Sequence, residues 1–446
     1  MDQHPGNTEH QESSATTSRR PQRGRTTPGP AEHNWAGNLT YRAHEVLHPR
    51  SVDELRAAMT HPGPKRLLGS RHSFNTIADT DGTLICLDLM PPVLEVHRDS
   101  VTVAGGMRYG DLAPTLHQQG LALGNLASLP HISVAGAVST GTHGSGDQIG
   151  TLASAVRTLT IMAPDGTTHT LHRGEPDFDG AVVSLGSLGA ILTLELDVEP
   201  TYEIAQTVLE QPRWEAVLEN FDDVTRLGRS VSIFTTWSRT DVADQIWVKS
   251  AVPAQVTQAE SDDLVELLGA RPATEKRHPL PGVSAESCSE QGGIPGPWYD
   301  RLPHFQLGFT PSAGAELQTE YLVPRRDAAA ALEAIRGLAT QIRPLLLANE
   351  LRTMSGDRLW LSPAHEEDTV GFHFTWRPDQ AAVTALLPRL EEALPASARP
   401  HWGKLFTFPA KEVRSRFPRW DDFAGLRGRF DPEGALRNDF LASMGL

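Results

Sequence analysis

The stretch Gly69-Ser70-Arg71-His72-Ser73-Phe74 directly follows the apolar run Arg66-Leu67-Leu68. A glycine at this position lets the backbone turn tightly and approach a ligand closely, because no side chain stands in the way. The pattern predicts a strand over 65–68 that ends in a turn presenting the imidazole of His72. A histidine after a strand is more often a surface or hydrogen-bonded residue, so this interpretation depends on a second feature.

Residues 125–146 provide that second feature. Their sequence is Asn-Leu-Ala-Ser-Leu-Pro-His-Ile-Ser-Val-Ala-Gly-Ala-Val-Ser-Thr-Gly-Thr-His-Gly-Ser-Gly. Small and hydroxylated residues with almost no charge are what a backbone N–H cradle for phosphates requires. The two stretches together indicate a site for a phosphate-bearing cofactor.

The order of elements before Pro200 favours an α+β fold. Ser51-Val52-Asp53-Glu54 is a capping box that opens a helix through Met59. No Gly-x-Gly-x-x-Gly opens a helix with an acid about 20 residues beyond it, which argues against the doubly wound sheet of a nicotinamide enzyme. The other expected elements are hairpins over 93–104 and 156–172, a helix over 109–119 capped by Gly120, and a strand over 191–196.

The chain divides by composition. At 446 residues, two domains are the expectation. Residues 1–33 are Ser, Thr, Gln, Pro, Gly and Arg with little to bury, and are predicted to be a disordered tail. A first block covers 34–200, a second covers 201–400, and a C-terminal segment covers 401–446.

The second block alternates strands and helices. Strands are expected over 231–234 and 245–248, and helices near 327–340 and 379–394. Residues 271–303 are rich in Pro, Gly and Ser, and are either an ordered loop over a site or a surface excursion.

Charge and apolar content exclude several partner classes. The net charge of −15 argues against nucleic acid or an anionic membrane. No apolar run approaches the roughly 20 residues of a membrane helix, and no apolar segment follows the early arginines, so no membrane span or secretory signal is expected. A cytoplasmic location is the default.

Cysteine and histidine spacing gives no metal motif. Cys86 and Cys288 are the only cysteines, which excludes a disulfide framework, and Cys86 is expected to be a buried thiol. There is no His-Glu-x-x-His or paired Cys-x-x-Cys, so no metal is expected, and no Gly-x-Ser-x-Gly elbow indicates a serine hydrolase.

Polar residues stand among apolar ones near Ser128, in Glu350-Leu351-Arg352, in His373-Phe374-Thr375-Trp376 and in His401-Trp402-Gly403-Lys404. Because alternate residues of a strand point the same way, Glu350 and Arg352 would share a face, and so would His373 and Thr375. An acid beside a base can hold a row of hydroxyls. Taken alone, Glu350 and Arg352 are more often a solvated ion pair, and Ser128 a turn former.

Lys404 is harder to interpret as a surface residue. The chain has five lysines against 35 arginines, and this one lies between aromatic residues. A desolvated lysine beside an arginine loses proton affinity and can act as a base near neutral pH.

These motifs, in this order and at this separation, resemble those of the vanillyl-alcohol-oxidase type of flavoprotein, with its PCMH-type FAD-binding domain. The likeness is greatest to the alditol (xylitol) oxidase branch, with the sugar-lactone oxidases next, and runs from about Asn34 to the C-terminus. It implies an FAD-binding domain over 34–200, an inserted α+β substrate (cap) domain over 201–400, and a return to the FAD domain over 401–446. It also implies that FAD is attached covalently through His72. Arg71 departs from the family pattern, which more often has a small residue there.

The resemblance further implies roles for single residues. Lys404 and Arg352 would be catalytic. The expected substrate contacts are Ser128, Glu350, Arg352, Thr375 and Lys404. The expected cofactor contacts are Leu67, Leu68, Gly69, Ser70, Arg71, His72, Ser73, Ser128, Ser133, Gly136, Thr140, Gly141, Thr142, His143, Ile191 and His401.

The expected function is that of a monomeric FAD-dependent oxidase without a nucleic-acid or membrane partner. It would convert the terminal primary alcohol of an alditol such as xylitol or sorbitol to an aldose, with hydride passing to flavin N5 and oxygen reduced to hydrogen peroxide. Two alternatives stay open. One is oxidation or dehydrogenation of an aldonolactone or another sugar on the same flavin, and the other is a non-catalytic flavin- or sugar-binding protein.

Overall fold

The computed structural model describes residues 32–308 and 316–446. Most of the tail expected over 1–33 therefore lies outside the described residues. Glu32 and His33 are described and belong to the folded chain, because Tyr41 N donates to Glu32 O at 2.9 Å and His33 forms a β-bridge with Thr40.

The turn of His72 ends a strand of a small parallel sheet. β1 (Glu45–Leu47) and β2 (Lys65–Leu68) both pair in parallel with β3 (Thr83–Cys86), which lies between them. Helix α1 (Val52–Thr60) connects β1 to β2. The predicted strand before His72 is confirmed.

The expected capping box of α1 forms only in half. Ser51 Oγ accepts from Glu54 N at 3.1 Å, as predicted. The Glu54 carboxylate, however, accepts from Arg50 N at 2.7 Å. It therefore caps the chain one residue earlier than the sequence pattern suggests.

Two predicted hairpins build a five-stranded antiparallel sheet in the described part of the first block. β4 (Leu94–Val96) pairs with β5 (Ser100–Ala104), and β7 (Val156–Met162) pairs with β8 (Thr168–His172). β9 (Ala190–Asp197) joins them by pairing with both β5 and β7. The remaining elements of this block are η1 (Thr76–Ala78), α2 (Tyr109–Gln118), β6 (Leu121–Ala122), α3 (Val134–Ser139), η2 (Leu152–Ala155), α4 (Phe178–Ala181) and β10 (Glu199–Pro200).

Residues 203–400 contribute a nine-stranded sheet among the described residues. Its central strands, in spatial order, are β13 (Gln245–Val252), β12 (Ser230–Thr235), β17 (Leu346–Met354), β18 (Thr369–Trp376) and β16 (Leu317–Pro324), and neighbours are antiparallel. Its outer strands are β11 (Glu203–Glu210), β14 (Arg271–Pro272), β15 (Gly296–Pro297) and β19 (Arg399–Pro400).

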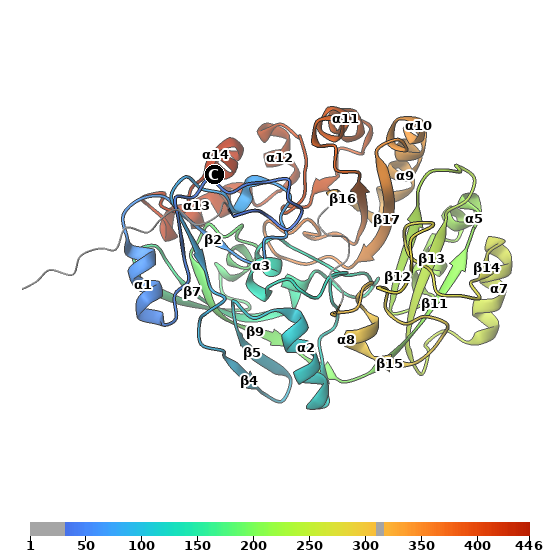
Figure 1. Cartoon of the computed structure of the whole chain (residues 1–446), viewed down its shortest axis with the longest axis horizontal. Coiled ribbons are helices and arrows are strands. Elements are labelled where there is room, and N and C mark those ends of the chain that lie inside the picture. Colours follow the sequence, from blue (N-terminus) through green and yellow to red (C-terminus); the bar gives the residue numbers. More distant parts are fainter. Residues whose placement is uncertain (1–31, 309–315) are drawn as a thin grey trace, which may run out of the picture. The chain divides into compact units, whose positions relative to one another are not determined.

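The central strands present two different faces. Leu351 and Phe372 are buried on the face covered by helices, whereas Glu350 and His373 line a cavity on the other. In Figure 1 the helices α9, α10 and α11 lie beyond the orange strands β16 and β17. The helices from residue 214 on are α5 (Trp214–Glu219), α6 (Phe221–Arg226), α7 (Gln258–Leu268), α8 (Trp298–Arg301), η3 (Arg325–Asp327), α9 (Ala328–Gly337), α10 (Ala339–Ile342), α11 (Gln380–Ala393), α12 (Ala410–Arg416), α13 (Trp420–Phe430) and α14 (Asp439–Met444).

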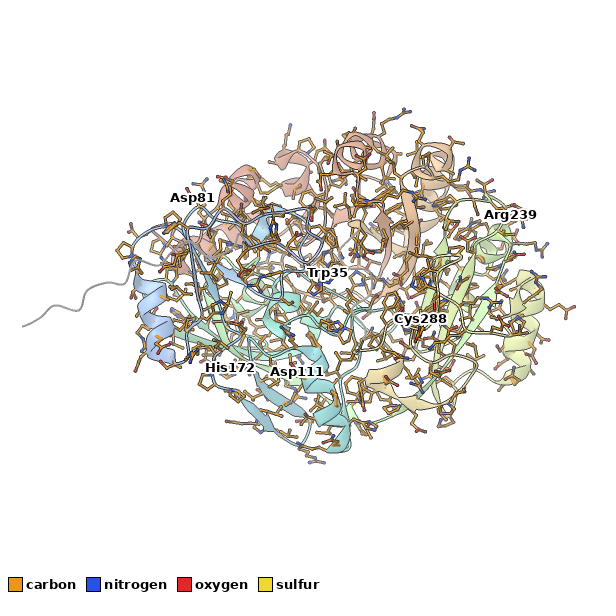
Figure 2. All side chains as sticks on the ribbon, viewed as in Figure 1. Trp35, Asp81, Asp111, His172, Arg239 and Cys288 are labelled. Atoms are coloured by element: carbon orange, nitrogen blue, oxygen red, sulfur yellow. The ribbon has the colours of Figure 1, made fainter. Side chains whose placement is uncertain are left out.

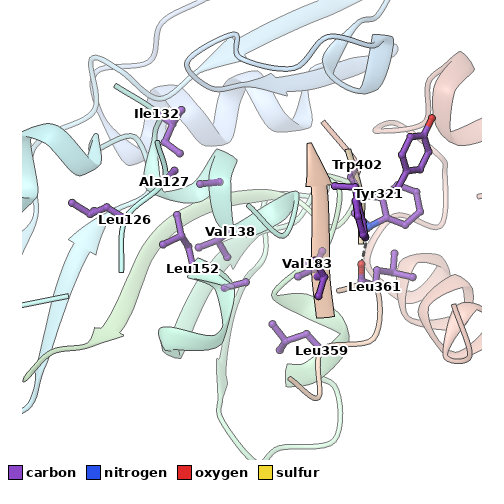
Figure 3. Close-up of a cluster of buried hydrophobic side chains, with 14 of the residues drawn as sticks. Leu126, Ala127, Ile132, Val138, Leu152, Val183, Tyr321, Leu359, Leu361 and Trp402 are labelled. Carbon is purple, nitrogen blue, oxygen red and sulfur yellow. Dashed lines mark hydrogen bonds between the residues drawn. The ribbon is translucent and has the colours of Figure 1, made fainter. Parts of the chain in front are cut away.

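Buried apolar residues connect the glycine-rich stretch to the C-terminal segment (Figure 3). Ala127 and Ile132 belong to the same core cluster as Trp402. Trp402 is fully buried, and its indole N–H donates to Leu361 O at 2.7 Å. A buried aromatic side chain whose one donor is satisfied is fixed in place. The backbone that carries Lys404, two residues on, is therefore held rigidly.

The C-terminal segment also closes on the first sheet. The guanidinium of Arg66, in β2, donates to Leu436 O at 2.8 Å and to Ile77 O at 2.7 Å. The amide of Asn438 donates to Ile77 O at 3.1 Å and to Asp79 O at 2.8 Å. Residues more than 350 positions apart thus hold the strand that leads to His72.

The fold is a mixed α+β arrangement with mainly antiparallel sheets, as expected. Residues 32–446 form one compact unit by their contacts, so the boundaries near 200 and 400 stay a prediction. None of the helices in the described ranges is long and apolar enough to cross a bilayer.

Candidate active site

One cavity of about 370 Å³ gathers the residues that the sequence singled out. Gly141 alone among them does not line it. Gly141 has φ +64°, and a Cβ there would meet Pro363 Cδ at 2.8 Å. The backbone conformation and the packing against Pro363 therefore require glycine at this position. The predicted residues that line the cavity are Leu67, Leu68, Gly69, Ser70, Arg71, His72, Ser73, Ser128, Ser133, Gly136, Thr140, Thr142, His143, Ile191, Glu350, Arg352, Thr375, His401 and Lys404.

Backbone hydrogen bonds clamp the His72 turn to the segment that carries Lys404. Phe74 N donates to Gly403 O at 2.8 Å. The amide of Asn75 donates to Trp402 O at 2.9 Å and to Lys404 O at 2.7 Å. The first and last motifs of the sequence therefore form one wall.

The two glycine-rich stretches are also joined, and their glycines make room that a side chain would fill. Ser133 N donates to Ser70 Oγ at 3.0 Å. A Cβ at Gly69 or Gly136 would lie 2.7 Å from Ser133 Oγ. Such a backbone-lined cleft lets phosphate and ring atoms come close to the chain, so the residues present fit FAD.

His72 lies against Trp35, with ring centroids 5.2 Å apart and planes at 26°. Trp35 lies near the middle of the view in Figure 2, whereas Asp81 and Arg239 lie at its periphery. Burial and, to a smaller extent, the nearby Lys404 lower the pKa of His72 to about 3, so the imidazole is neutral. A neutral imidazole keeps a nitrogen lone pair available for bond formation.

Arg71 adopts a left-handed backbone conformation, with φ +64°. This region disfavours residues with a Cβ, which accounts for the preference of the family for a small residue. Two contacts hold Arg71 there: its O accepts from Trp35 N at 2.8 Å, and its guanidinium lies 3.0 Å from the Glu32 carboxylate. The departure from the family pattern is thus accommodated by residues near the start of the described chain.

The register of the nine-stranded sheet arranges the polar residues in rows. Phe234, Glu350, His373 and Glu320 are successive cross-strand neighbours on β12, β17, β18 and β16. Adjacent strands lie about 4.8 Å apart, so the row from Glu350 to Glu320 spans roughly 10 Å. A chain of several hydroxylated carbons can lie along such a row.

A second row lies beside it. Ala348 faces Thr375, and Thr375 faces Gln318 on β16. Gln318 Oε1 accepts a hydrogen bond from Lys404 Nζ. The predicted substrate residues Thr375 and Lys404 therefore meet at Gln318, a residue that was not predicted.

Glu320 is the central buried carboxylate, and the sequence reasoning missed it. It is 2% exposed, and its Oε1 lies 2.7 Å from Arg352 Nη2 and 3.1 Å from His143 Nε2. Its Oε2 lies 3.3 Å from His373 Nδ1. Arg352 and the histidines hold the pKa of Glu320 well below its usual range against the opposing effect of burial.

Arg352 connects three parts of the cavity. Besides Glu320, its guanidinium reaches Ser128 Oγ at 3.2 Å and Glu350 Oε1 at 3.6 Å. Glu350 and Arg352 are 5% and 7% exposed, so their interpretation as a solvated ion pair is wrong. They share one face of β17, as the alternation predicted.

The pKa of Lys404 is lowered by burial although carboxylates lie nearby. Its Nζ lies 4.9 Å from the centroid of the Phe74 ring. Burial, with a smaller contribution from Arg352, lowers the pKa of Lys404 to about 8 against the opposing effect of Glu320. A lysine in this state exchanges its proton near neutral pH.

His401 has a defined orientation. Its backbone N donates to Glu320 O at 2.9 Å, and Gly403 N donates to its Nδ1 at 3.1 Å. Because Nδ1 accepts, the proton of the neutral ring is on Nε2. Burial lowers the pKa of His401 well below its ordinary value, which keeps the ring neutral.

The Pro-, Gly- and Ser-rich segment over 271–303 does reach the site. Its residues His278, Pro279 and Leu280 line the cavity, as do His304 and Phe305 just beyond it. His304 was not predicted, and its Nε2 lies 2.7 Å from Glu350 Oε1. The interpretation as an ordered loop over a site is confirmed.

Both cysteines are free and buried, which confirms the expectation of a buried thiol at Cys86. Cys86 belongs to a group with His48 and Asp88 whose possible ligand atoms lie within 4.8 Å of one another. Burial raises the pKa of the Cys86 thiol to about 12, and His48 Nδ1 already bonds to the Asp88 carboxylate at 2.7 Å. The group has the packing of a buried thiol beside a surface pair.

Known proteins share both halves of this arrangement. Residues 43–172 match a family model described as an FAD binding domain, and residues 315–444 match one described as D-arabinono-1,4-lactone oxidase. An alditol oxidase of Streptomyces sp. (strain IKD472 / FERM P-14339) is 45% identical over 417 residues, covering 92% of this chain and 98% of that protein.

Lactone-oxidising proteins are more distant relatives. An L-gulono-1,4-lactone dehydrogenase of Mycobacterium tuberculosis is 26% identical over 430 residues, which cover 92% of this chain and 98% of that protein. An L-gulonolactone oxidase of Mus musculus is 27% identical over 440 residues, which cover 92% and 96%.

Proposed function

The chain belongs to the alditol oxidase family of FAD-dependent oxidoreductases, and from that membership we propose that it oxidises the terminal primary alcohol of an open-chain polyol. The alcohol loses two electrons and two protons and becomes an aldose, and oxygen takes them up to become hydrogen peroxide. The observation that carries the proposal is the polar floor of the cavity. Glu350 lies in one row, and the adjacent row of Thr375 and Gln318 ends at Lys404.

FAD, when bound, accepts the hydride that leaves the alcohol carbon. The residues of this chain position the substrate and move its proton. Lys404 in its free-amine form takes the proton of the reacting hydroxyl, and Arg352, which stays charged, stabilises negative charge on the same oxygen. Glu350 and Thr375 hold hydroxyls farther along the polyol, so that the reacting carbon stays in place.

The closest rival is oxidation of an aldonolactone, because relatives named for lactones share most of the chain length. A lactone ring cannot extend its hydroxyls along a row roughly 10 Å long, whereas an open polyol chain can. Steady-state peroxide release with xylitol, sorbitol and a gulonolactone separates the two. A higher kcat/KM for the lactone would refute the polyol proposal, and no turnover of any sugar would favour a binding protein.

We also propose that FAD is attached covalently through His72, whose neutral ring and fixed stacking on Trp35 suit a nucleophilic nitrogen. Acid precipitation tests this directly, since covalent flavin stays with the protein. His72→Ala should release the colour into the supernatant. Flavin that stays with the precipitate of this variant would place the attachment elsewhere.

A further inference from the structure

A buried lysine lies behind the substrate cavity without lining it. Lys249, on β13, is 1% exposed. Its Nζ donates to Leu302 O, to Pro303 O at 3.2 Å and to His304 Nδ1 at 3.0 Å. An ammonium group has three N–H donors, and three acceptors surround this one.

The position of Lys249 fixes the proton of His304. An ammonium group cannot accept a hydrogen bond, so His304 Nδ1 must be the acceptor. Burial lowers the pKa of His304 to about 4, so the ring is neutral and its single proton is on Nε2. That Nε2–H points at Glu350 Oε1, 2.7 Å away.

Aromatic packing keeps the ring in this orientation. Phe234 and Trp247 meet His304 edge-on, with centroids 5.5 Å and 5.3 Å away and planes at 69° and 78°. Both aromatic side chains are buried. Rotation of the ring would require them to move, so its two nitrogens stay in their places.

Glu350 needs this second source of positive charge. Arg352 lies 2.7 Å from Glu320 but 3.6 Å from Glu350, so one guanidinium serves two buried carboxylates unequally. Lys249 is the second cation: it bonds to His304, which in turn bonds to Glu350. Both protein contacts of Glu350 go to Oε1, which leaves Oε2 without a protein partner in the described part of the chain.

We propose that Lys249 and His304 are positioning residues for substrate binding: Lys249 anchors the Nδ1 side of the His304 ring, and His304 holds Glu350 so that its second oxygen accepts a hydrogen bond from a polyol hydroxyl. This inference rests on the proposed function only for the identity of the substrate. Lys249 does not line the cavity, and its one contact with a residue that does is the bond to His304. This relay, the contacts from Lys249 through His304 to Glu350, therefore acts on polyol binding more than on the chemical step.

Two amide substitutions separate the two bonds of His304. Glutamine places its NH₂ near the position of Nε2, so His304→Gln keeps the hydrogen bond to Glu350 and loses the acceptor for Lys249. Asparagine reaches only the position of Nδ1, so His304→Asn keeps the acceptor for Lys249 and loses the hydrogen bond to Glu350. We expect His304→Asn to raise KM for xylitol at least tenfold with kcat within threefold of the parent, and His304→Gln to stay within threefold in both.

Lys249→Met tests the anchor at Nδ1 of His304. We expect it to raise KM at least tenfold in the parent but less than threefold in the His304→Gln background, where the bond between Lys249 and Nδ1 is already absent. Lys65→Met is a matched control, because Lys65 is a buried lysine outside the cavity whose Nζ donates to Gly63 O. Its KM should not change. Measurements at pH 6 keep Lys249 charged, since burial lowers its pKa to about 7.

A second measurement does not depend on turnover. In protein labelled with ¹⁵N-histidine, His304 should show a protonated Nε2 and an unprotonated Nδ1, and Lys249→Met should shift the Nδ1 resonance, because Nδ1 loses its donor, while Nε2 stays protonated against Glu350. Equal KM values for the Gln and Asn variants, or a protonated Nδ1 in the parent, would overturn the inference. If the parent turns over no polyol, the proposed function fails and the ¹⁵N spectrum alone decides the relay.

Discussion

Replacing Lys404 by methionine tests the proposed chemistry most directly. Methionine fills a similar volume but cannot take a proton. In the native site, Lys404 Nζ bonds to Gln318 and lies 4.9 Å from the Phe74 ring centroid, and methionine can keep the apolar part of these contacts. The substitution therefore removes the base while disturbing the packing little.

The size of the effect follows from the pKa of Lys404. With a pKa of about 8, roughly a tenth of the lysine is free amine at pH 7, against about one part in three thousand for an ordinary lysine. A positioned base contributes about 10²–10⁴-fold to such a proton transfer. We expect flavin reduction to slow by about 10²–10³-fold in Lys404→Met, with polyol binding weakened far less.

Anaerobic stopped flow measures this step alone. The parent's rate constant for flavin reduction should rise with pH up to the ionisation near 8 and then level off, because only the deprotonated amine accepts a proton. In the variant the dependence on this group should disappear. Reoxidation of the reduced flavin by oxygen should change little.

Lys411→Met is the matched control, because Lys411 is an exposed lysine on α12. It should reduce flavin at the parent rate. A rate constant for Lys404→Met within a few-fold of the parent would refute the assignment of the base. Lys404 would then be a binding residue, and His401 or a water would be the candidate base.

The remaining predictions concern binding, the cofactor cleft and pH. Glu350→Gln should raise KM for xylitol by about 10–100-fold, since a hydrogen bond to a charged group is lost, but should affect glycerol less than threefold; equal losses would contradict the row of hydroxyls. Gly69→Ala should lower the ratio of bound flavin to protein, because its Cβ would lie 2.7 Å from Ser133 Oγ, whereas Gly337→Ala, with nothing within 4 Å, should keep full flavin. The folded-state pKa of His304, about 4, is below that of the unfolded chain, so stability is full above about pH 6.5 and is lost as pH falls towards 4. Between pH 7 and 4.5 the free energy of unfolding of His304→Gln should therefore fall by about 2–3 kcal/mol less than that of the parent. Urea unfolding measures this, and an unchanged pH dependence would count against a buried neutral ring.

The local elements were predictable because their signals are local. Pro164-Asp165-Gly166 forms the expected turn, with Asp165 Oδ1 accepting from Thr167 N at 2.8 Å and Gly166 at φ +83°. The alternation in Glu350-Leu351-Arg352 placed the charged residues together on one face of β17. Such patterns need only neighbours in sequence, and the structure confirms them.

The residues that the sequence analysis missed are those whose structural role depends on strands distant in sequence. Glu316, Gln318 and Glu320 alternate in and just before β16, and this period of two was a usable signal for a polar strand face. It does not reveal that Glu320 is buried against Arg352, because their shared neighbour, β18, follows about 50 residues later. Burial of a carboxylate is a property of the assembled sheet.

Lys249 and His304 were even harder to predict from the sequence, for the same reason. In sequence, Lys249 follows the apolar run Gln245-Ile246-Trp247-Val248, and His304 follows the loop over 271–303. Neither lies in a motif. Their contact joins a sheet strand to a loop 55 residues away, and only the packed Trp247 and Phe234 make it specific.

The hydrogen bonds of Arg66 and Asn438 also impose an order of events on biosynthesis. A ribosome releases the His72 turn into solution long before it makes Leu436 and Asn438. Until then the guanidinium of Arg66 lacks its bond to Leu436 O, and the carbonyl groups of Ile77 and Asp79 lack the bonds from the Asn438 amide. The strand that presents His72 is therefore completed only when nearly the whole chain has been translated, and capture of the flavin follows protein synthesis instead of accompanying it.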